Sequence, residues 1–171
     1  MSPAHERSTM DRFTERLADF DVSYTLTAPD DVAAAIEDVT TQPAIGVELP
    51  DGLGDLPETV ETDPSPAELR EASTGVTEAR LGIADYGSLV LPTTADGVEP
   101  ISLFPEHHVG VVSSEDVVPG MADALADLGE CFRNASGSAV VATGPSATAD
   151  MGALVKGAHG PKTVHAIIVE P

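Results

Sequence analysis

Cysteine, lysine and aromatic side chains are scarce in this chain of 171 residues. Cys131 is the only cysteine, which excludes an internal disulfide. It also excludes an iron–sulfur cluster or a zinc ion held by four cysteines of this chain. Tryptophan is absent, and the aromatic residues are four phenylalanines and two tyrosines. The core is therefore expected to consist mainly of Val, Leu, Ile and Ala.

Long apolar runs are also missing. No stretch approaches the roughly 20 apolar residues that a membrane-spanning helix needs, and the first residues lack the apolar centre of a secretion signal. We therefore expect a cytoplasmic protein without a membrane span. A length of 171 residues with 42% apolar content predicts one folded domain over residues 1–171 rather than a disordered chain.

Positive charge is the third deficit. The chain has 29 acidic residues against 8 lysines and arginines, which gives a net charge of −21. Nucleic acid is excluded as a partner, because phosphate contacts need basic side chains. The acids are spread along the chain and do not form the block typical of an acidic tail. We interpret them as adaptation to a salt-rich cytoplasm, where screening weakens the repulsion between surface carboxylates.

Alternating helical and strand-like segments predict an α/β domain with a largely parallel sheet flanked by helices. Helices are expected at 10–20 after a Ser8 or Thr9 cap, at 32–39, at 66–75 after Ser65-Pro66, and at 121–128. Strands are expected at 22–26, 44–49, 81–91, 101–112, 139–143 and 164–169, with a short one near Val60. The last two long runs show no polar alternation, which predicts strands covered on both faces.

The few cations are unevenly placed. Residues 1–130 carry 27 acids and five arginines, whereas residues 131–169 carry one acid, Asp150, against Arg133, Lys156 and Lys162. A buried core would explain the missing acids. It would not explain the lysines, which are seldom buried without a partner. A local anion-binding site would explain both observations.

Three segments contain the residues best suited to chemistry, namely 82–91, 102–109 and 143–162. The third begins with Thr143-Gly144-Pro145-Ser146, where a strand is expected to pass into a helix. Backbone amides and hydroxyls at such a junction suit a carboxylate or a phosphate.

These segments, in this order, resemble the LUD (lactate-utilisation) domain family of LutC/YkgG-like proteins over residues 75–170. The most specific matches are Gly144-Pro145-Ser146-x-Thr148-Ala149-Asp150 and Gly157-x-His159-Gly160-Pro161. The chain departs from the family pattern at three places. Asp85-Tyr86 replaces Glu-Thr, Glu106 replaces a second Pro, and Ala147 replaces an Arg, as in a divergent, haloarchaeal-type member.

The resemblance implies a fold similar to NagB/RpiA-type sugar-phosphate isomerases and CoA transferases. It implies an accessory component of the oxidation of lactate, or a related 2-hydroxy acid, to pyruvate. Separate iron–sulfur or flavin proteins would carry the electrons, with no cofactor in this chain. Two alternatives remain open. One is an enzyme acting on a sugar phosphate or an acyl thioester, and the other is a non-catalytic docking domain.

The resemblance also implies site residues. Asp85 would be a nucleophile or base, with Lys156 or Lys162 replacing the missing arginine. A small anionic ligand would be held by Gly87, Ser88, Ser146, Thr148, Asp150, His159, Gly160 and Lys162. His108 and His159 are expected to form hydrogen bonds, with metal ligation as the alternative. The neighbours His107 and His108 cannot both serve one site, because adjacent strand residues point to opposite faces.

The charge imbalance predicts that folding depends on salt. At about 0.01 M ionic strength the Debye length is roughly 30 Å, so nearly all carboxylates repel one another, whereas at about 1 M it is roughly 3 Å. Since domains are stable by only about 5–15 kcal/mol, we expect the melting temperature to rise steeply from millimolar to molar KCl. Thermal melts monitored by circular dichroism measure this, and a melting temperature that stays flat contradicts the salt-adaptation interpretation.

Overall fold

Two helices begin at serines that cap them, as the sequence predicts. In the computed structural model, which describes residues 8–134, 137–150, 153–157 and 159–171, helix α1 (Thr9–Asp19) starts after Ser8. The Ser8 hydroxyl accepts the Asp11 amide at 3.0 Å, and the Asp11 carboxylate accepts the Ser8 amide at 3.3 Å. Ser65 and Glu68 form the same reciprocal pair at the start of α3 (Pro66–Glu71).

The remaining helices connect the strands. They are α2 (Val32–Val39), α4 (Val98–Leu103) and α5 (Met121–Asn134), with short 3-10 turns η1 (Pro29–Asp31) and η2 (Ser114–Asp116). Helix α2 has the bounds that the sequence predicts, and α5 continues about two turns beyond its predicted end.

The main sheet has six strands in the order β1-β12-β7-β4-β2-β3, and all of its neighbours are parallel. Its strands are β1 (Val22–Thr27), β2 (Ala44–Gly46), β3 (Val60–Thr62), β4 (Thr74–Glu78), β7 (His107–Ser113) and β12 (Thr163–Val169). Because the strands are parallel, their amino ends lie at one edge of the sheet and their carboxyl ends at the opposite edge. The predicted α/β domain with a largely parallel sheet is confirmed.

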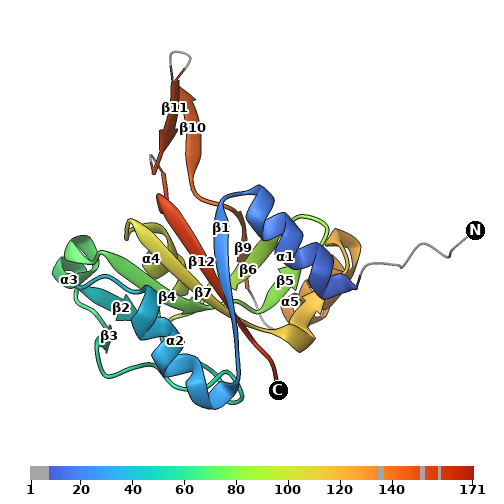
Figure 1. Cartoon of the computed structure of the whole chain (residues 1–171), viewed down its shortest axis with the longest axis horizontal. Coiled ribbons are helices and arrows are strands. Elements are labelled where there is room, and N and C mark those ends of the chain that lie inside the picture. The colour runs from blue at the N-terminus through green and yellow to red at the C-terminus, as the bar shows by residue number, and fades with distance from the viewer. Residues whose placement is uncertain (1–7, 135–136, 151–152, 158) are drawn as a thin grey trace, which may run out of the picture.

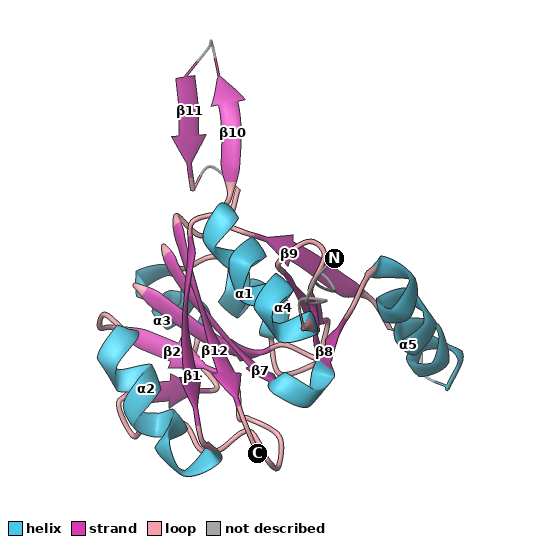
Figure 2. Ribbon diagram, turned by 45° about the vertical axis from the view of Figure 1, so that its right-hand side comes forward, coloured by secondary structure: helices cyan, strands magenta, loops and turns pink. Residues whose placement is uncertain are grey.

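A second sheet of four strands has the order β8-β5-β6-β9. Its strands are β5 (Leu81–Ile83), β6 (Ser88–Pro92), β8 (Val117–Val118) and β9 (Ala139–Thr143). The remaining strands, β10 (Ala147–Asp150) and β11 (Ala153–Lys156), form an antiparallel hairpin. This hairpin projects away from the body of the molecule, as Figure 1 and Figure 2 show.

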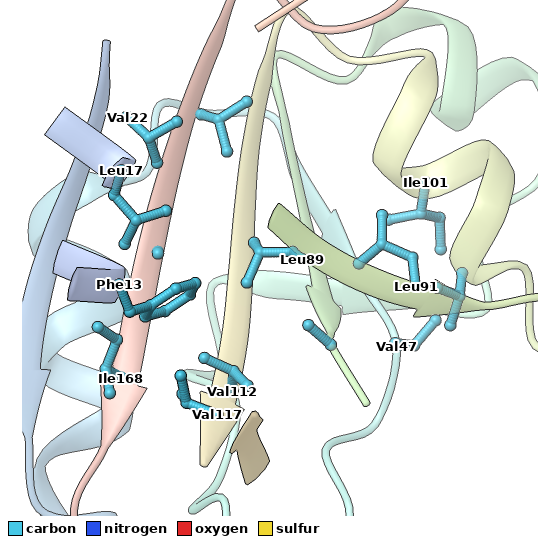
Figure 3. Close-up of a cluster of buried hydrophobic side chains, with 14 of the residues drawn as sticks. Phe13, Leu17, Val22, Val47, Leu89, Leu91, Ile101, Val112, Val117 and Ile168 are labelled. Atoms are coloured by element: carbon cyan, nitrogen blue, oxygen red, sulfur yellow. The ribbon is translucent and has the colours of Figure 1, made fainter. Parts of the chain in front are cut away.

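Apolar side chains cover the two faces of the main sheet differently. Helix α2 packs Val32 and Ile36 on one face. On the other face, Phe13 and Leu17 of α1 meet Ile168 of β12 together with side chains of the smaller sheet (Figure 3). Both helix residues are almost fully buried. The main sheet is therefore the middle layer, with α2 on one side and α1 with the smaller sheet on the other (Figure 2).

Five sequence predictions are wrong. The expected strand 101–112 begins with helix α4, which follows Gly97 at φ 89°, and becomes a strand only at His107. The expected helix 66–75 ends at Glu71, because Thr74 to Glu78 join the main sheet as β4. Strand β9 is an edge strand that is partly exposed, so of the two runs predicted to be covered on both faces β12 alone is.

The fourth error concerns the segment after Ser146, where a helix was predicted. The chain instead forms the β10–β11 hairpin, in which Ala147 lies opposite Lys156. The left-handed residues Gly144 (φ 67°) and Gly157 (φ 79°) turn the chain into and out of the hairpin. The predicted run 81–91 likewise divides into β5 and β6 at a turn containing Gly87 (φ 60°).

Within the described part of the chain, no helix combines the length and apolar character that crossing a membrane would require.

Two glycine substitutions are expected to have opposite effects on stability. A Cβ at position 75 would lie 2.0 Å from the Ile101 carbonyl oxygen, so Gly75→Ala forces α4 away from β4 and should cost about 1–3 kcal/mol. Gly129 lies within α5, where the nearest atom to an added Cβ is a flexible arginine end at 3.7 Å. Gly129→Ala should therefore stabilise by about 1 kcal/mol. Denaturant titrations measure both, and an unchanged midpoint for Gly75→Ala contradicts the packing.

Candidate functional site

The main sheet has a cleft at each edge. A pocket of about 170 Å³ lies at the amino ends of β7 and β12, where it is lined by His108 and Val164. A larger cleft of about 620 Å³ lies at the carboxyl ends of β4, β7 and β12, where Glu78, Ser113 and Val169 line it. The two clefts are therefore at opposite edges of the same sheet.

The smaller cleft, here called the histidine pocket, combines hydrogen-bonding side chains from distant segments. Its polar side chains are Ser102, His108, Thr143, Ser146 and His159, and its remaining lining is apolar side chains, glycines and prolines. Among the described residues that line it there is no Asp, Glu, Lys or Arg. This composition is unusual in a chain where 29 of 171 residues are acidic.

The base of the β10–β11 hairpin forms one wall of the pocket. The Gly157 amide donates to the Ser146 carbonyl at 2.8 Å, and the Ser146 amide donates to the Pro161 carbonyl at 2.9 Å. The His159 amide donates to the Ser146 hydroxyl at 3.4 Å. A Cβ at Gly160 would lie 3.1 Å from the Cβ of Ser146, so this close approach depends on glycine. Ser146, His159 and Gly160, which sequence reasoning selected, thus lie together in the pocket.

His108 forms the floor of the pocket on the sheet side. Its side chain is 2% exposed, and its Nε2 atom lies 2.8 Å from the hydroxyl of Thr77 on the neighbouring strand β4. Burial lowers the pKa of His108 to about 4, with a smaller contribution from repulsion by His107. The imidazole is therefore neutral at neutral pH and can form hydrogen bonds without carrying charge.

Ser88 supports the pocket from behind. It is 1% exposed, and its hydroxyl lies 2.6 Å from the hydroxyl of Thr143, which lines the pocket. The sequence analysis selected Ser88. It placed Ser102 and Thr143 in segments suited to chemistry without selecting them as site residues, and it missed the supporting Thr77, whose apolar neighbours gave no functional signal.

Asp85 and Gly87 lie elsewhere. The Asp85 carboxylate accepts a hydrogen bond from Arg12 Nη1 of α1 at 2.7 Å, and it does not line the histidine pocket. A Cβ at Gly87 would lie 2.7 Å from the Arg16 carbonyl carbon, so this glycine allows α1 to pack closely against the turn. The structure therefore gives both residues contacts with α1 and does not bring them to the other site residues.

Both lysines form ion pairs with acids from distant parts of the chain. Lys156 Nζ lies 3.1 Å from Asp21, and Lys162 forms an ion pair with Glu106. Neither lysine lines the histidine pocket. Thr148 and Asp150 belong to β10, and their side chains fall outside what the structure describes. His108 and His159 both line the pocket, but no described group of three or more His, Cys, Asp or Glu could hold a metal ion.

The larger cleft, here called the acidic cleft, has the opposite character. Five carboxylates line it, from Asp51, Glu78, Glu115, Asp116 and Asp127. Its cation is Arg80, whose Nε donates to Asp127 at 2.8 Å. Burial raises the pKa of Glu78 and of Asp116, although the charge of Arg80 opposes both shifts. A small anion would be repelled in this cleft, so the histidine pocket is the better candidate for one.

Comparison with known proteins places the chain in a family. The model of the LUD domain matches residues 61–169. The chain belongs to the LUD domain family. A solved structure of a DUF162 family protein from Deinococcus radiodurans has the same fold. It superposes with a TM-score of 0.73 at 22% identity, over 94% of this chain and 96% of that one.

Curated relatives of this LUD chain include two named lactate utilization protein C. The protein from Bacillus licheniformis is 33% identical over 58% of this chain and 43% of its own length. The protein from Oceanobacillus iheyensis is 30% identical over 58% of this chain and 45% of its own length. YkgG of Escherichia coli, which is described as uncharacterized, is 29% identical over 60% of this chain and 46% of its own length. The matched region thus spans less than half the length of these relatives.

The buried histidine predicts that acid destabilises the fold when salt screens the carboxylates. An exposed imidazole in the unfolded chain titrates near pH 6.5, whereas His108 titrates at about 4 in the folded chain. Between these values the unfolded chain binds the extra proton, so the free energy of unfolding should fall from about pH 6.5 to 4, by roughly 3 kcal/mol. Burial also lowers the pKa of His107 and of His165, so these two residues should add to the loss of stability as the pH falls.

Denaturant titrations in molar KCl at several pH values measure this dependence. His108→Gln removes one titrating group and should make the decline less steep. A slope that this substitution leaves unchanged contradicts the assignment to His108.

Proposed function

We propose that this LUD chain is an accessory component in the oxidation of lactate, or a related 2-hydroxy acid, to pyruvate. We propose further that the histidine pocket holds the small carboxylate. The main support is the composition of the pocket, which offers hydroxyls and imidazoles but no described carboxylate in a chain with 29 acidic residues. Relatives named lactate utilization protein C support a role in lactate utilisation at the level of the family.

The size of the pocket agrees with a ligand of this class. A volume of about 170 Å³ equals about five or six water molecules at roughly 30 Å³ each. Lactate is a ligand of this size, since it has six non-hydrogen atoms. Pockets for drug-sized ligands are larger, with volumes of about 300–1,000 Å³. A small carboxylate would fit within this volume, whereas part of a sugar phosphate or an acyl-CoA would extend outside the pocket.

We propose that the electrons go to other proteins. Oxidation of a 2-hydroxy acid to a 2-oxo acid releases two electrons and two protons. With Cys131 as its only cysteine, this chain cannot ligate an iron–sulfur cluster through four cysteines of its own. Separate iron–sulfur or flavin proteins are therefore the proposed partners and electron acceptors.

The β10–β11 hairpin supports contact with such a partner. An isolated two-stranded hairpin is only marginally stable in water. This one projects from the body (Figure 1), and no other described helix or strand packs extensively against it. Its base also forms a wall of the histidine pocket, through Ser146 at one end and His159 at the other. A protein that docks on the hairpin would therefore contact the rim of the pocket.

Deleting the gene is expected to abolish growth on lactate, and the wild-type gene should restore it. Complementation with Ser146→Leu, which fills the pocket, should fail. Asp85→Asn should restore growth, because this carboxylate pairs with Arg12 outside the pocket. Growth rate and lactate consumption are the measurements. Unimpaired growth of the deletion strain contradicts the proposed role, and failure of Asp85→Asn alone favours the transferase alternative.

A further inference from the structure

A hydroxyl and an imidazole form a hydrogen bond directly behind the histidine pocket. Thr77 of β4 is fully buried, and its Oγ1 atom lies 2.8 Å from Nε2 of His108 on β7. His108 lines the pocket, whereas Thr77 does not. Thr77 can therefore influence a ligand only through the ring of His108.

The other ring nitrogen opens into the pocket. Nδ1 of His108 has no hydrogen-bond partner among the described residues, since Thr77 is the one partner of its side chain. Nδ1 is also not fully buried. Among the described side chains, the polar atoms that are fully buried without a hydrogen-bond partner are Arg12 Nε and Thr94 Oγ1, and His108 Nδ1 is not one of them. Because His108 is only 2% exposed and lines the pocket, we infer that Nδ1 faces the pocket.

The position of the ring proton follows from the hydroxyl. In the described structure, the Thr77 hydroxyl has the His108 ring as its partner. If Nε2 carried the proton, the hydroxyl hydrogen of fully buried Thr77 would have no acceptor, which costs about 1–3 kcal/mol. If the hydroxyl donates to Nε2, its proton is satisfied. Nδ1 then carries the single proton of the neutral ring.

We propose that His108 presents an Nδ1–H donor to a small carboxylate in the histidine pocket and that Thr77 is the positioning residue that fixes this tautomer. The location of the ligand rests on the proposed function, whereas the tautomer does not. A neutral donor suits the surroundings, because burial disfavours an imidazolium at this depth. The ligand class is a small carboxylate because the pocket offers donors and hydroxyls without a competing described acid.

A second buried histidine provides a control within the same chain. Both ring nitrogens of His165 lie near hydroxyls, with Nδ1 2.7 Å from Ser23 and Nε2 2.9 Å from Thr25. His165 does not line the histidine pocket. Thr25→Val therefore removes a comparable threonine–histidine bond on the sheet without touching the candidate site.

The test is NMR of the full chain in molar KCl, with ¹⁵N-labelled histidine and long-range ¹H–¹⁵N correlation of the rings. We expect wild-type His108 to show the single neutral Nδ1–H tautomer. Titration with L-lactate, and with acetate as a minimal carboxylate, should shift the Nδ1 resonance. Thr77→Val should give mixed tautomers and weaken binding about two- to fivefold, because only the fraction of rings that still carry the Nδ1 proton can donate to the ligand. Thr77→Ser should restore both properties, and Thr25→Val should alter His165 alone.

Three outcomes would overturn the inference. They are a wild-type Nε2–H tautomer, an unchanged tautomer and affinity in Thr77→Val, and a carboxylate that binds without moving His108 resonances. The wild-type tautomer and the Thr77→Ser variant decide the matter even if Thr77→Val does not fold. If lactate shifts Nδ1 but the deletion strain grows normally on lactate, the proposed function fails while this inference stands.

Discussion

A carboxylate that is buried without a cation costs several kcal/mol, and this chain has 29 acidic residues for 8 lysines and arginines. Nearly every acid must therefore remain in water, and the interior must be built without charge. The buried polar residues meet this condition, because all of them are hydroxyls or imidazoles: Thr74, Thr77, Ser88, Ser102, His108 and His165. Ser102 and His108 of this set line the histidine pocket.

The same uncharged groups link neighbouring strands of the main sheet. Thr77 and His108 connect β4 with β7, and His165 connects β12 with the Ser23 and Thr25 hydroxyls of β1. His107 of β7 lies 2.8 Å from the Thr163 hydroxyl of β12. The bonds of His108 and His165 satisfy polar atoms that would be costly to bury alone. The bond that links β4 to β7 therefore also orients a ring that faces the histidine pocket.

Local signals in the sequence predicted the elements that depend on local chemistry. Ser8 begins α1 through its own neighbour Asp11, and the apolar run of β12 needs no distant information. Strand β4 was missed because three of its four buried positions are Thr74, Gly75 and Thr77. The hydroxyls of the two threonines find partners far along the chain. For the site, the motif around Ser146 and His159 was informative. The sequence did not reveal that Asp85 pairs with Arg12 or that Lys162 pairs with Glu106. Such ion pairs join distant residues and form only when the chain folds.

The two clefts show how a strongly acidic chain can still favour an anionic ligand. The composition predicts molar salt, where the Debye length is about 3 Å and the field of the whole surface hardly reaches a pocket. Discrimination must then come from direct contacts. In the acidic cleft an anion would meet five carboxylates at short range, and Arg80 is already engaged by Asp127. In the histidine pocket it would meet imidazoles and hydroxyls. Hydrogen bonds of this kind lose little strength to salt, so short-range donors suit molar salt better than a charged clamp does.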